Sequence, residues 1–170
     1  MRWIWIALLG FLTACASVGE IRDPSAPFSS IALFDEQRFA GAWFEVASFS
    51  QDKKCTVQGY NYAPSGQKRF DVYRSCVVPF FELPTIGRAK IVGPGRLRQS
   101  LKGGPSGEIW VLWVDADYRT AILAARDGRE AWILDRSSRI SEDRMNVAKE
   151  VLRFNGYDTG KLIRLTGEAA

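Results

Sequence analysis

The side chains that could carry chemistry in this 170-residue sequence are three cysteines and a set of acids and arginines, because histidine is absent. Without histidine, His-based nucleophilic triads, His general bases and His-ligated zinc sites are all excluded. The sequence also has no paired-acid motif, so an isomerase-type enzyme would depend on a single acid such as Glu45 or Glu130. We therefore predict no catalytic residue, no metal site and no cofactor.

The sequence has three cysteines, Cys15, Cys55 and Cys76. Disulfides use cysteines in pairs, so in an exported protein an odd number leaves one cysteine that needs another role. The first follows a positive start at Arg2 and a continuous apolar run over residues 3–11. That run is too short to cross a bilayer, which takes about 20 apolar residues, and is typical of the core of a signal peptide.

Residues 12–15, Leu-Thr-Ala-Cys, resemble the lipobox of bacterial lipoproteins. The resemblance implies that residues 1–14 are a signal peptide and that Cys15 becomes the lipidated first residue. A diacylglycerol plus an amide-linked acyl chain such as palmitate would hold the protein stably on a membrane. Ala16 stands where retention in the inner membrane typically requires aspartate, which implies the periplasmic face of the outer membrane of a Gram-negative bacterium. The alternative is an ordinary signal peptide followed by an accidental cysteine.

Residues 15–30 are rich in proline and serine and show little periodicity, so we predict a lipidated cysteine and a flexible tether there. Residues 31–170 are long enough for one domain with a well-buried core. The formal net charge of +4 is spread along the chain without a block of lysines and arginines. We therefore expect no nucleic-acid partner.

The domain contains a series of short runs rich in β-branched and aromatic residues, separated mostly by tight-turn signals such as Pro64-Ser65-Gly66. The runs are residues 43–49, 56–62, 70–77, 87–92, 96–101, 108–114, 119–124 and 130–136. This pattern favours an all-β fold, an eight-stranded up-and-down antiparallel barrel.

A single helix follows the strands. Ser141 can cap its N-terminus and Gly156 can end it. An apolar stripe at helical spacing is formed by Met145, Ala148, Val151 and Leu152. We expect this helix to pack on the outside of the barrel, and residues 162–165 to form a short return strand.

Alternating the strand directions brings three separate motifs to one end of the barrel: Gly41 and Trp43, then Asp117 and Tyr118, then Arg136. This constellation resembles the lipocalin family, with its Gly-x-Trp, its Thr-Asp-Tyr-like turn and its arginine after the eighth strand; alanine here replaces the threonine. Further similarity to the bacterial outer-membrane lipoprotein lipocalins lies in residues 44–47, 87–89, 132–134 and 155–158. The resemblance covers residues 34–165 and implies a barrel that binds small hydrophobic ligands.

The shared motif has a structural explanation. Trp43 can plug the narrow end, while Arg136 stacks on its indole and donates to backbone carbonyls of residues 34–40. We assign these residues to stability and not to ligand contact.

If one end is plugged, the ligand belongs at the other. The open mouth would carry the loops at residues 50–54, 78–86, 102–107 and 126–128. The second of these contains Phe80, Phe81 and Leu83, which is unusually apolar for a solvent loop. It could act as a lid or touch the bilayer; the alternative is a loop folded onto its own barrel.

Alternation along the strands, with Trp43 inward, predicts the wall of the cavity. The predicted lining residues are Phe49, Gln58, Tyr60, Tyr62, Val72, Arg74, Val111, Trp113, Ile122 and Trp132. Such a wall is mostly apolar with a few polar groups, which suits a small amphipathic molecule. Arg74 could meet a carboxylate or phosphate head group, or it could pair internally with Glu130 or Glu45, which we favour.

Cys55 and Cys76 would lie near the mouth on neighbouring strands, and a disulfide between them is expected in the periplasm. If Cys55 faces Cys76, the two strands pair in a register that differs by one residue from the register in which Tyr60 faces Val72. A β-bulge near Gly59 would allow both pairings.

Three functions follow from these patterns. The leading one is a lipid-anchored carrier of fatty acids, lysophospholipids or similar molecules, serving envelope maintenance or stress. The second is an interaction module that docks a membrane protein through its apolar loop. The third, an isomerase-type enzyme, is disfavoured by the missing histidine and acid pair. The sequence is silent on oligomeric state.

Overall fold

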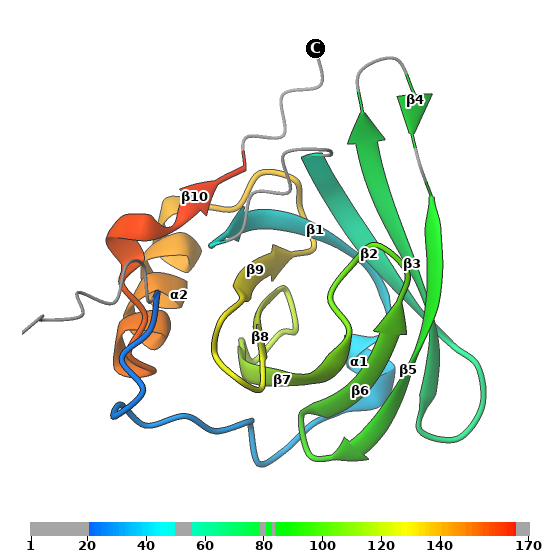
Figure 1. Ribbon diagram of the computed structural model, residues 1–170, viewed down its shortest axis with the longest axis horizontal. Coiled ribbons are helices and arrows are strands. Elements are labelled where there is room, and N and C mark those ends of the chain that lie inside the picture. The colour runs from blue at the N-terminus through cyan, green and yellow to red at the C-terminus, as the bar shows by residue number, and fades with distance from the viewer. Residues whose placement is uncertain (1–20, 50–55, 79–80, 83, 166–170) are drawn as a thin grey trace, which may run out of the picture.

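The computed structural model describes residues 21–49, 56–78, 81–82 and 84–165, without the side chains of 56–58, 76–78 and 81–82. Within these ranges, eight strands form a closed antiparallel barrel in up-and-down order (Figure 1). They are β1 (Gly41–Ser48), β2 (Thr56–Pro64), β3 (Arg69–Val78), β5 (Thr85–Gly93), β6 (Arg96–Leu101), β7 (Gly107–Val114), β8 (Thr120–Ala125) and β9 (Ala131–Asp135). The barrel closes because β1 pairs with β9 as well as with β2. The predicted fold class is confirmed.

The helix α2 (Glu142–Phe154) packs on the outside of the barrel, as predicted (Figure 1). The hydroxyl of Ser141 accepts a hydrogen bond from the backbone N–H of Arg144, which caps the first turn. Met145, Ala148 and Leu152 are buried in one apolar cluster with residues of β8 and β9. Among the described residues, no helix combines the length and apolar character that crossing a membrane requires.

The remaining elements are short. The strand β10 (Ile163–Arg164) pairs with β1 and corresponds to the predicted return strand. Three elements were not predicted: α1 (Glu36–Phe39), β4 (Phe81–Glu82) and η1 (Thr159–Lys161). The first of these covers the end of the barrel where β1 begins, with Phe39 fully buried.

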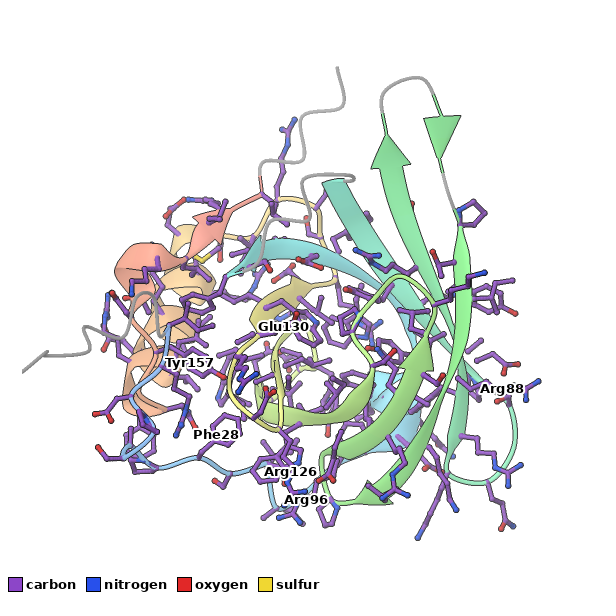
Figure 2. The ribbon with its side chains drawn as sticks, in the orientation of Figure 1. Phe28, Arg88, Arg96, Arg126, Glu130 and Tyr157 are labelled. Carbon is purple, nitrogen blue, oxygen red and sulfur yellow. The ribbon has the colours of Figure 1, made fainter. Side chains whose placement is uncertain are left out.

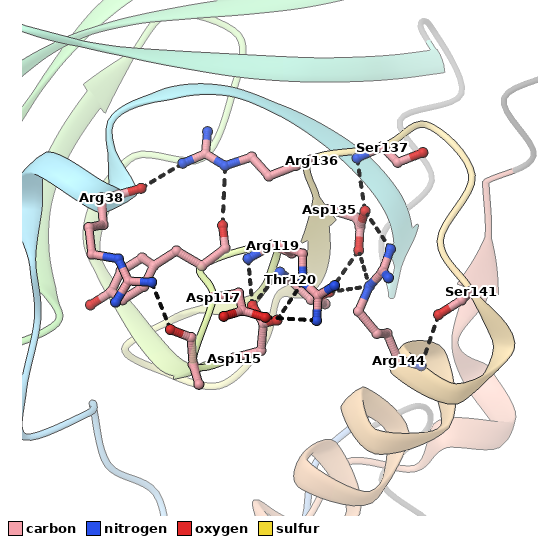
Figure 3. A network of polar contacts seen from close by, with 12 residues as sticks. Arg38, Asp115, Asp117, Arg119, Thr120, Asp135, Arg136, Ser137, Ser141 and Arg144 are labelled. Atoms are coloured by element: carbon pink, nitrogen blue, oxygen red, sulfur yellow. Dashed lines mark hydrogen bonds and ion pairs between the residues drawn. The ribbon is translucent and has the colours of Figure 1, made fainter.

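The helix α2 is fixed to the barrel by a buried ion pair that sequence patterns did not indicate. Arg144 Nε lies 3.1 Å from Asp135 Oδ2, and the Asp135 side chain is almost completely buried (Figure 3). The hydroxyl of Thr120 donates to the same carboxylate oxygen at 2.7 Å. These bonds satisfy a charge that would otherwise be costly to bury.

The end of the predicted tether, from residue 21 onward, is docked on the protein and is not a free linker. The backbone N–H of Asp23 donates to the carbonyl of Gly156 at 2.8 Å. The ring of Phe28 stacks on Trp110, with 5.1 Å between centroids. This part of the tether prediction is therefore wrong, because apolar and backbone contacts with the barrel and α2 outweigh the flexibility that composition suggested. The part before residue 21 lies outside the described residues.

Candidate functional site

One end of the barrel is closed by Arg136 and Trp43, where the three-motif constellation placed them. The guanidinium carbon of Arg136 lies 3.7 Å from the centroid of the Trp43 ring. Its nitrogens donate to the carbonyls of Ala40 at 2.9 Å and Ala42 at 2.6 Å. They also donate to the carbonyl of Arg38 at 2.7 Å (Figure 3). One cation therefore covers the indole and ties α1 to the start of β1.

Gly41 and Tyr118 supply the tight backbone turns at this end. Gly41 has a φ of +96°, and a Cβ there would lie 3.4 Å from Arg136 Nη1, so glycine fits best. Tyr118 has a φ of +57°. Its hydroxyl accepts a hydrogen bond from the backbone N–H of Asp35 at 2.9 Å, and Arg38 lies over its ring. The aromatic side chain thus braces the segment before α1.

Asp115 holds the turn before β8, although the resemblance had pointed to Asp117. A carboxylate oxygen of Asp115 accepts the backbone N–H groups of Arg119 at 2.5 Å and Thr120 at 2.8 Å. Asp117 makes an ion pair with Arg119 at 3.0 Å, and its side chain is mostly exposed. The spacing of Asp115 before the strand is the signal that sequence reasoning could have used, since aspartate commonly bonds the backbone a few residues on.

Next to the plug, the interior of the barrel is filled by side chains. Tyr62, Val72 and Val111 were predicted to line the cavity, but each is completely buried in a core cluster. The ring of Tyr62 packs against Phe39 and Phe70, with centroid distances of 5.0 and 5.8 Å. These residues do face inward, yet they belong to a sealed core and not to accessible space. Large aromatic rings fill this half of the barrel, which alternation alone does not reveal.

The opposite end holds a cavity of about 520 Å³, within the usual range for small-molecule sites. Its wall combines strand residues with two loops: Glu45, Ser48, Tyr60, Arg74, Gly103, Gly104, Pro105, Ser106, Ala125, Asp127, Arg129, Glu130 and Trp132. Three predicted residues, Tyr60, Arg74 and Trp132, are therefore brought together here. Figure 2 shows Glu130 within the ring of strands. Polar groups are more prominent in this wall than the predicted apolar pocket implied.

The most buried polar groups of the cavity come from the first three strands. The hydroxyl of Tyr60 donates to Glu45 Oε2 at 3.1 Å, and Glu45 is only 9% exposed. Arg74, 5% exposed, donates to the carbonyl of Gly103 at 2.5 Å. Burial raises the pKa of Glu45 from 4.5 to about 7, although hydrogen bonds from Tyr60 and Ser48 and the charge of Arg74 act in the opposite direction. The charge of Arg74 thus acts on Glu45, while the internal ion pair that we favoured for Arg74 stays a prediction.

Three residues predicted to line the cavity, Phe49, Trp113 and Ile122, instead pack outside the barrel in the cluster beneath α2. A register shift after Glu45 reverses the inward and outward faces of β1 before Phe49. A second shift, after Val111, does the same in β7 before Trp113. The strand β8 is buried on both faces, so its hydrophobic pattern cannot tell which face is inward.

Several predicted residues lie outside the described part of the structure. They are Cys15, Cys55, Phe80 and Leu83, together with the side chains of Gln58, Cys76 and Phe81. The register shift between Val57 and Gly59 agrees with the expected bulge. However, the backbone pairs Cys76 with Val57, and Tyr60 lies opposite Arg74, two positions from the Val72 partner that we had assumed. The lipidation, the disulfide and the role of the mouth loop stay predictions.

Comparison with known proteins shows which family this chain resembles in sequence. Residues 34–166 match the family model described as a lipocalin-like domain. The chain is 25% identical to the outer membrane lipoprotein Blc of Citrobacter freundii, over 93% of this chain and 94% of that protein. It is 27% identical to temperature-induced lipocalin-1 of Arabidopsis thaliana, over 74% of this chain and 75% of that protein.

Solved structures show the same fold. Insecticyanin from the tobacco hornworm Manduca sexta is similar with a TM-score of 0.65 and 24% identity, covering 86% of this chain and 88% of that chain. Lobster apocrustacyanin A1 is similar with a TM-score of 0.63 and 17% identity, covering 79% of this chain and 81% of that chain. At these identities the likeness concerns the barrel and not the ligand.

Proposed function

Because the chain belongs to the lipocalin family and is of the bacterial Blc type, we propose that it is a lipid-anchored carrier of small amphipathic molecules. The observation that carries this proposal is the cavity of about 520 Å³ at the barrel end opposite the Arg136–Trp43 plug. A closed barrel with one plugged end offers its ligand a single route, which suits reversible uptake and delivery. Fatty acids and lysophospholipids are the proposed ligands, and envelope maintenance or stress is the proposed setting.

The proposed location is the periplasmic face of the outer membrane. The lipobox-like residues 12–15 support an acylated Cys15. The similarity to proteins named outer membrane lipoproteins supports the same location, although the identity is only 25–26%. Anchoring would keep the carrier next to the bilayer from which such ligands are drawn.

The test is native mass spectrometry of the purified full chain, followed by titration with fatty acids and lysophospholipids. The full chain is used because the segment from residue 21 onward packs on the barrel. We expect co-purified or bindable ligand at a ratio of one per chain. Electrospray of the tryptic N-terminal peptide from the same preparation tests the anchor, since acylation of Cys15 adds the mass of its lipid.

A matched pair of variants separates cavity binding from surface adsorption. Ala125 lines the cavity, whereas Ala116 is exposed in the turn at the plugged end. Ala125→Phe should reduce ligand occupancy by roughly tenfold, because the added ring fills space that a ligand needs. Ala116→Phe should leave occupancy unchanged. A chain that neither carries nor binds any acyl ligand would contradict the carrier function and favour the interaction module.

A further inference from the structure

The deepest accessible part of the cavity is polar. Beyond it, toward the plug, Phe39, Tyr62 and Phe70 fill the barrel and are at most 2% exposed. The groups that a ligand would meet last are therefore those of Glu45 and Arg74, which line the cavity with little exposure of their own. An apolar chain pushed to this depth would cover charged groups without offering them hydrogen bonds, which is unfavourable.

Hydrogen-bond donors gather around this depth. Arg74 brings a guanidinium that cannot lose its charge, and Tyr60 brings a hydroxyl whose proton is donated to Glu45 and becomes available to a ligand when Glu45 no longer accepts it. Trp132 also lines the cavity and is 3% exposed, and its buried Nε1 has no acceptor among the described residues. A buried indole N–H is normally satisfied, so this donor points to an acceptor that arrives with a ligand.

We infer that the cavity takes carboxylic acids head first, with the carboxylate among Arg74, Tyr60 and Trp132 and the apolar part toward the mouth, and that Glu45 is protonated when the ligand is bound. The inference rests on the proposed function and narrows its ligand class. A carboxylate supplies two acceptor oxygens and a single negative charge, which matches one buried cation and its neighbouring neutral donors.

The coupling to a proton follows from the charges around Glu45. Arg74 faces it from β3, Tyr60 and Tyr62 from β2, and Glu130 from the segment before β9. Asp127 and Arg129 stand at the mouth and pair with each other at 3.9 Å. Among the described residues at this depth only Arg74 is positively charged, so a ligand carboxylate and an ionised Glu45 would compete for the same cation.

The proton balance of the step is simple. The ligand enters as the carboxylate anion, and a Glu45 that is still ionised takes one proton from solvent as the anion arrives, whereas a Glu45 that is already protonated takes none. The neutral Glu45 carboxyl then has an O–H that can donate to the ligand. Burial already raises the pKa of Glu45 to about 7, so little further shift is needed at neutral pH.

The experiment measures binding of decanoate, decanol and decylamine to the full chain by calorimetry at about pH 6 and about pH 8. Decanoate should bind about tenfold more tightly than decanol at the lower pH, and its affinity should fall about tenfold per pH unit above the pKa of Glu45. The affinity for decanol should not depend on pH. Titrations at about pH 8 in buffers of different ionisation enthalpy should show uptake of close to one proton with decanoate, whereas at about pH 6, where Glu45 is already mostly protonated, the uptake should be near zero.

Three variants complete the test. Glu45→Gln fixes this position in a neutral form and should retain decanoate binding while losing its pH dependence. Arg74→Gln should abolish the preference for decanoate over decanol. The control Arg98→Gln removes an arginine from the exposed outer face of β6 and should change neither. Thermal unfolding verifies that each variant is folded.

The possible failures are distinguishable. Equal binding of decanol and decanoate, tighter binding of decylamine, or an unchanged pH dependence in Glu45→Gln would overturn the head-first inference and leave the carrier function standing. If none of the three probes binds and no acyl ligand is found by native mass spectrometry, the proposed function and the inference are both overturned.

Discussion

Asp135 and Arg136 are consecutive, yet their side chains leave the end of β9 toward opposite parts of the molecule. Asp135 pairs with Arg144 of α2, while Arg136 donates to the carbonyl of Arg38 in α1 (Figure 3). Arg136 also stacks on Trp43 and bonds the carbonyl of Ala40. Because neighbouring residues of a strand point to opposite faces, one position secures the helix outside and the next closes the barrel. The end of β9 therefore links the closed end of the barrel to α2.

Replacing Arg136 by lysine should destabilise the protein by about 2 kcal/mol, because an ammonium cannot reproduce the stacking and the several carbonyl bonds of a guanidinium. Urea unfolding followed by tryptophan fluorescence measures the effect. Arg119→Lys is the control, since Arg119 is half-exposed in surface ion pairs and its replacement should cost less than about 0.5 kcal/mol. Equal effects of the two variants would contradict the plug.

Arg144→Met should destabilise the protein by about 2–3 kcal/mol, because it leaves the buried carboxylate of Asp135 without its cation. Adding Asp135→Asn removes that stranded charge, so the double variant should recover a large part of the loss. Equilibrium unfolding of the wild type, both single variants and the double variant gives the coupling energy. Additive effects would show that the pair does not hold α2.

A row of like charges crosses the outer face of the barrel, where Arg69, Lys90 and Arg98 lie directly opposite one another on β3, β5 and β6. Lys90→Glu should therefore stabilise the protein by about 0.5–1 kcal/mol at low salt, with the gain shrinking at high salt. Arg88→Glu is the matched control, because Arg88 faces Asp71 in a weak ion pair and its reversal should be neutral or destabilising. Thermal unfolding at two salt concentrations measures both variants.

The fold could be predicted largely from sequence because most strands end in a recognisable turn and the helix begins at a capping residue. Trp43 and Arg136 could be placed together because strand direction alone puts both at one end, whatever the side-chain packing. The ion pair of Asp135 with Arg144 could not be predicted in the same way. Its members lie in different elements, and only the docking of α2 brings them together.

The cavity was harder to predict because each β-bulge reverses the inward face of the strand after it. Phe49 and Trp113 were misplaced for that reason. The hydrophobic pattern did not reveal the bulges, because both faces of these strands are covered near α2 and carry apolar residues. The bulge near Gly59 was detectable only because two cysteines conflicted with the expected register. Tyr62 faces inward as predicted but is sealed, since cavity volume depends on how the rings pack.

Glu45 should make the stability of the unliganded protein depend on pH. Its pKa in the folded protein is raised from 4.5 to about 7, so the folded state holds the proton more tightly than the unfolded chain does. The contribution of Glu45 to the free energy of unfolding is therefore largest below about pH 4.5 and falls as the pH rises toward 7. Above pH 7 this contribution is lower by up to about 3 kcal/mol than at pH 4.5. The Glu45→Gln variant has no ionisable side chain at this position, so its stability should not fall with pH for this reason.

The difference in unfolding free energy between Glu45→Gln and the wild type should accordingly grow in favour of the variant from about pH 5 to about pH 8. Other titrating groups change both proteins alike, so the difference isolates Glu45. Urea unfolding at several pH values provides the measurement, with Glu108→Gln as the control because Glu108 bonds Trp110 at the surface of β7. A constant difference across this range would mean that Glu45 is ionised and well compensated in the folded cavity, with Arg74 as its permanent partner.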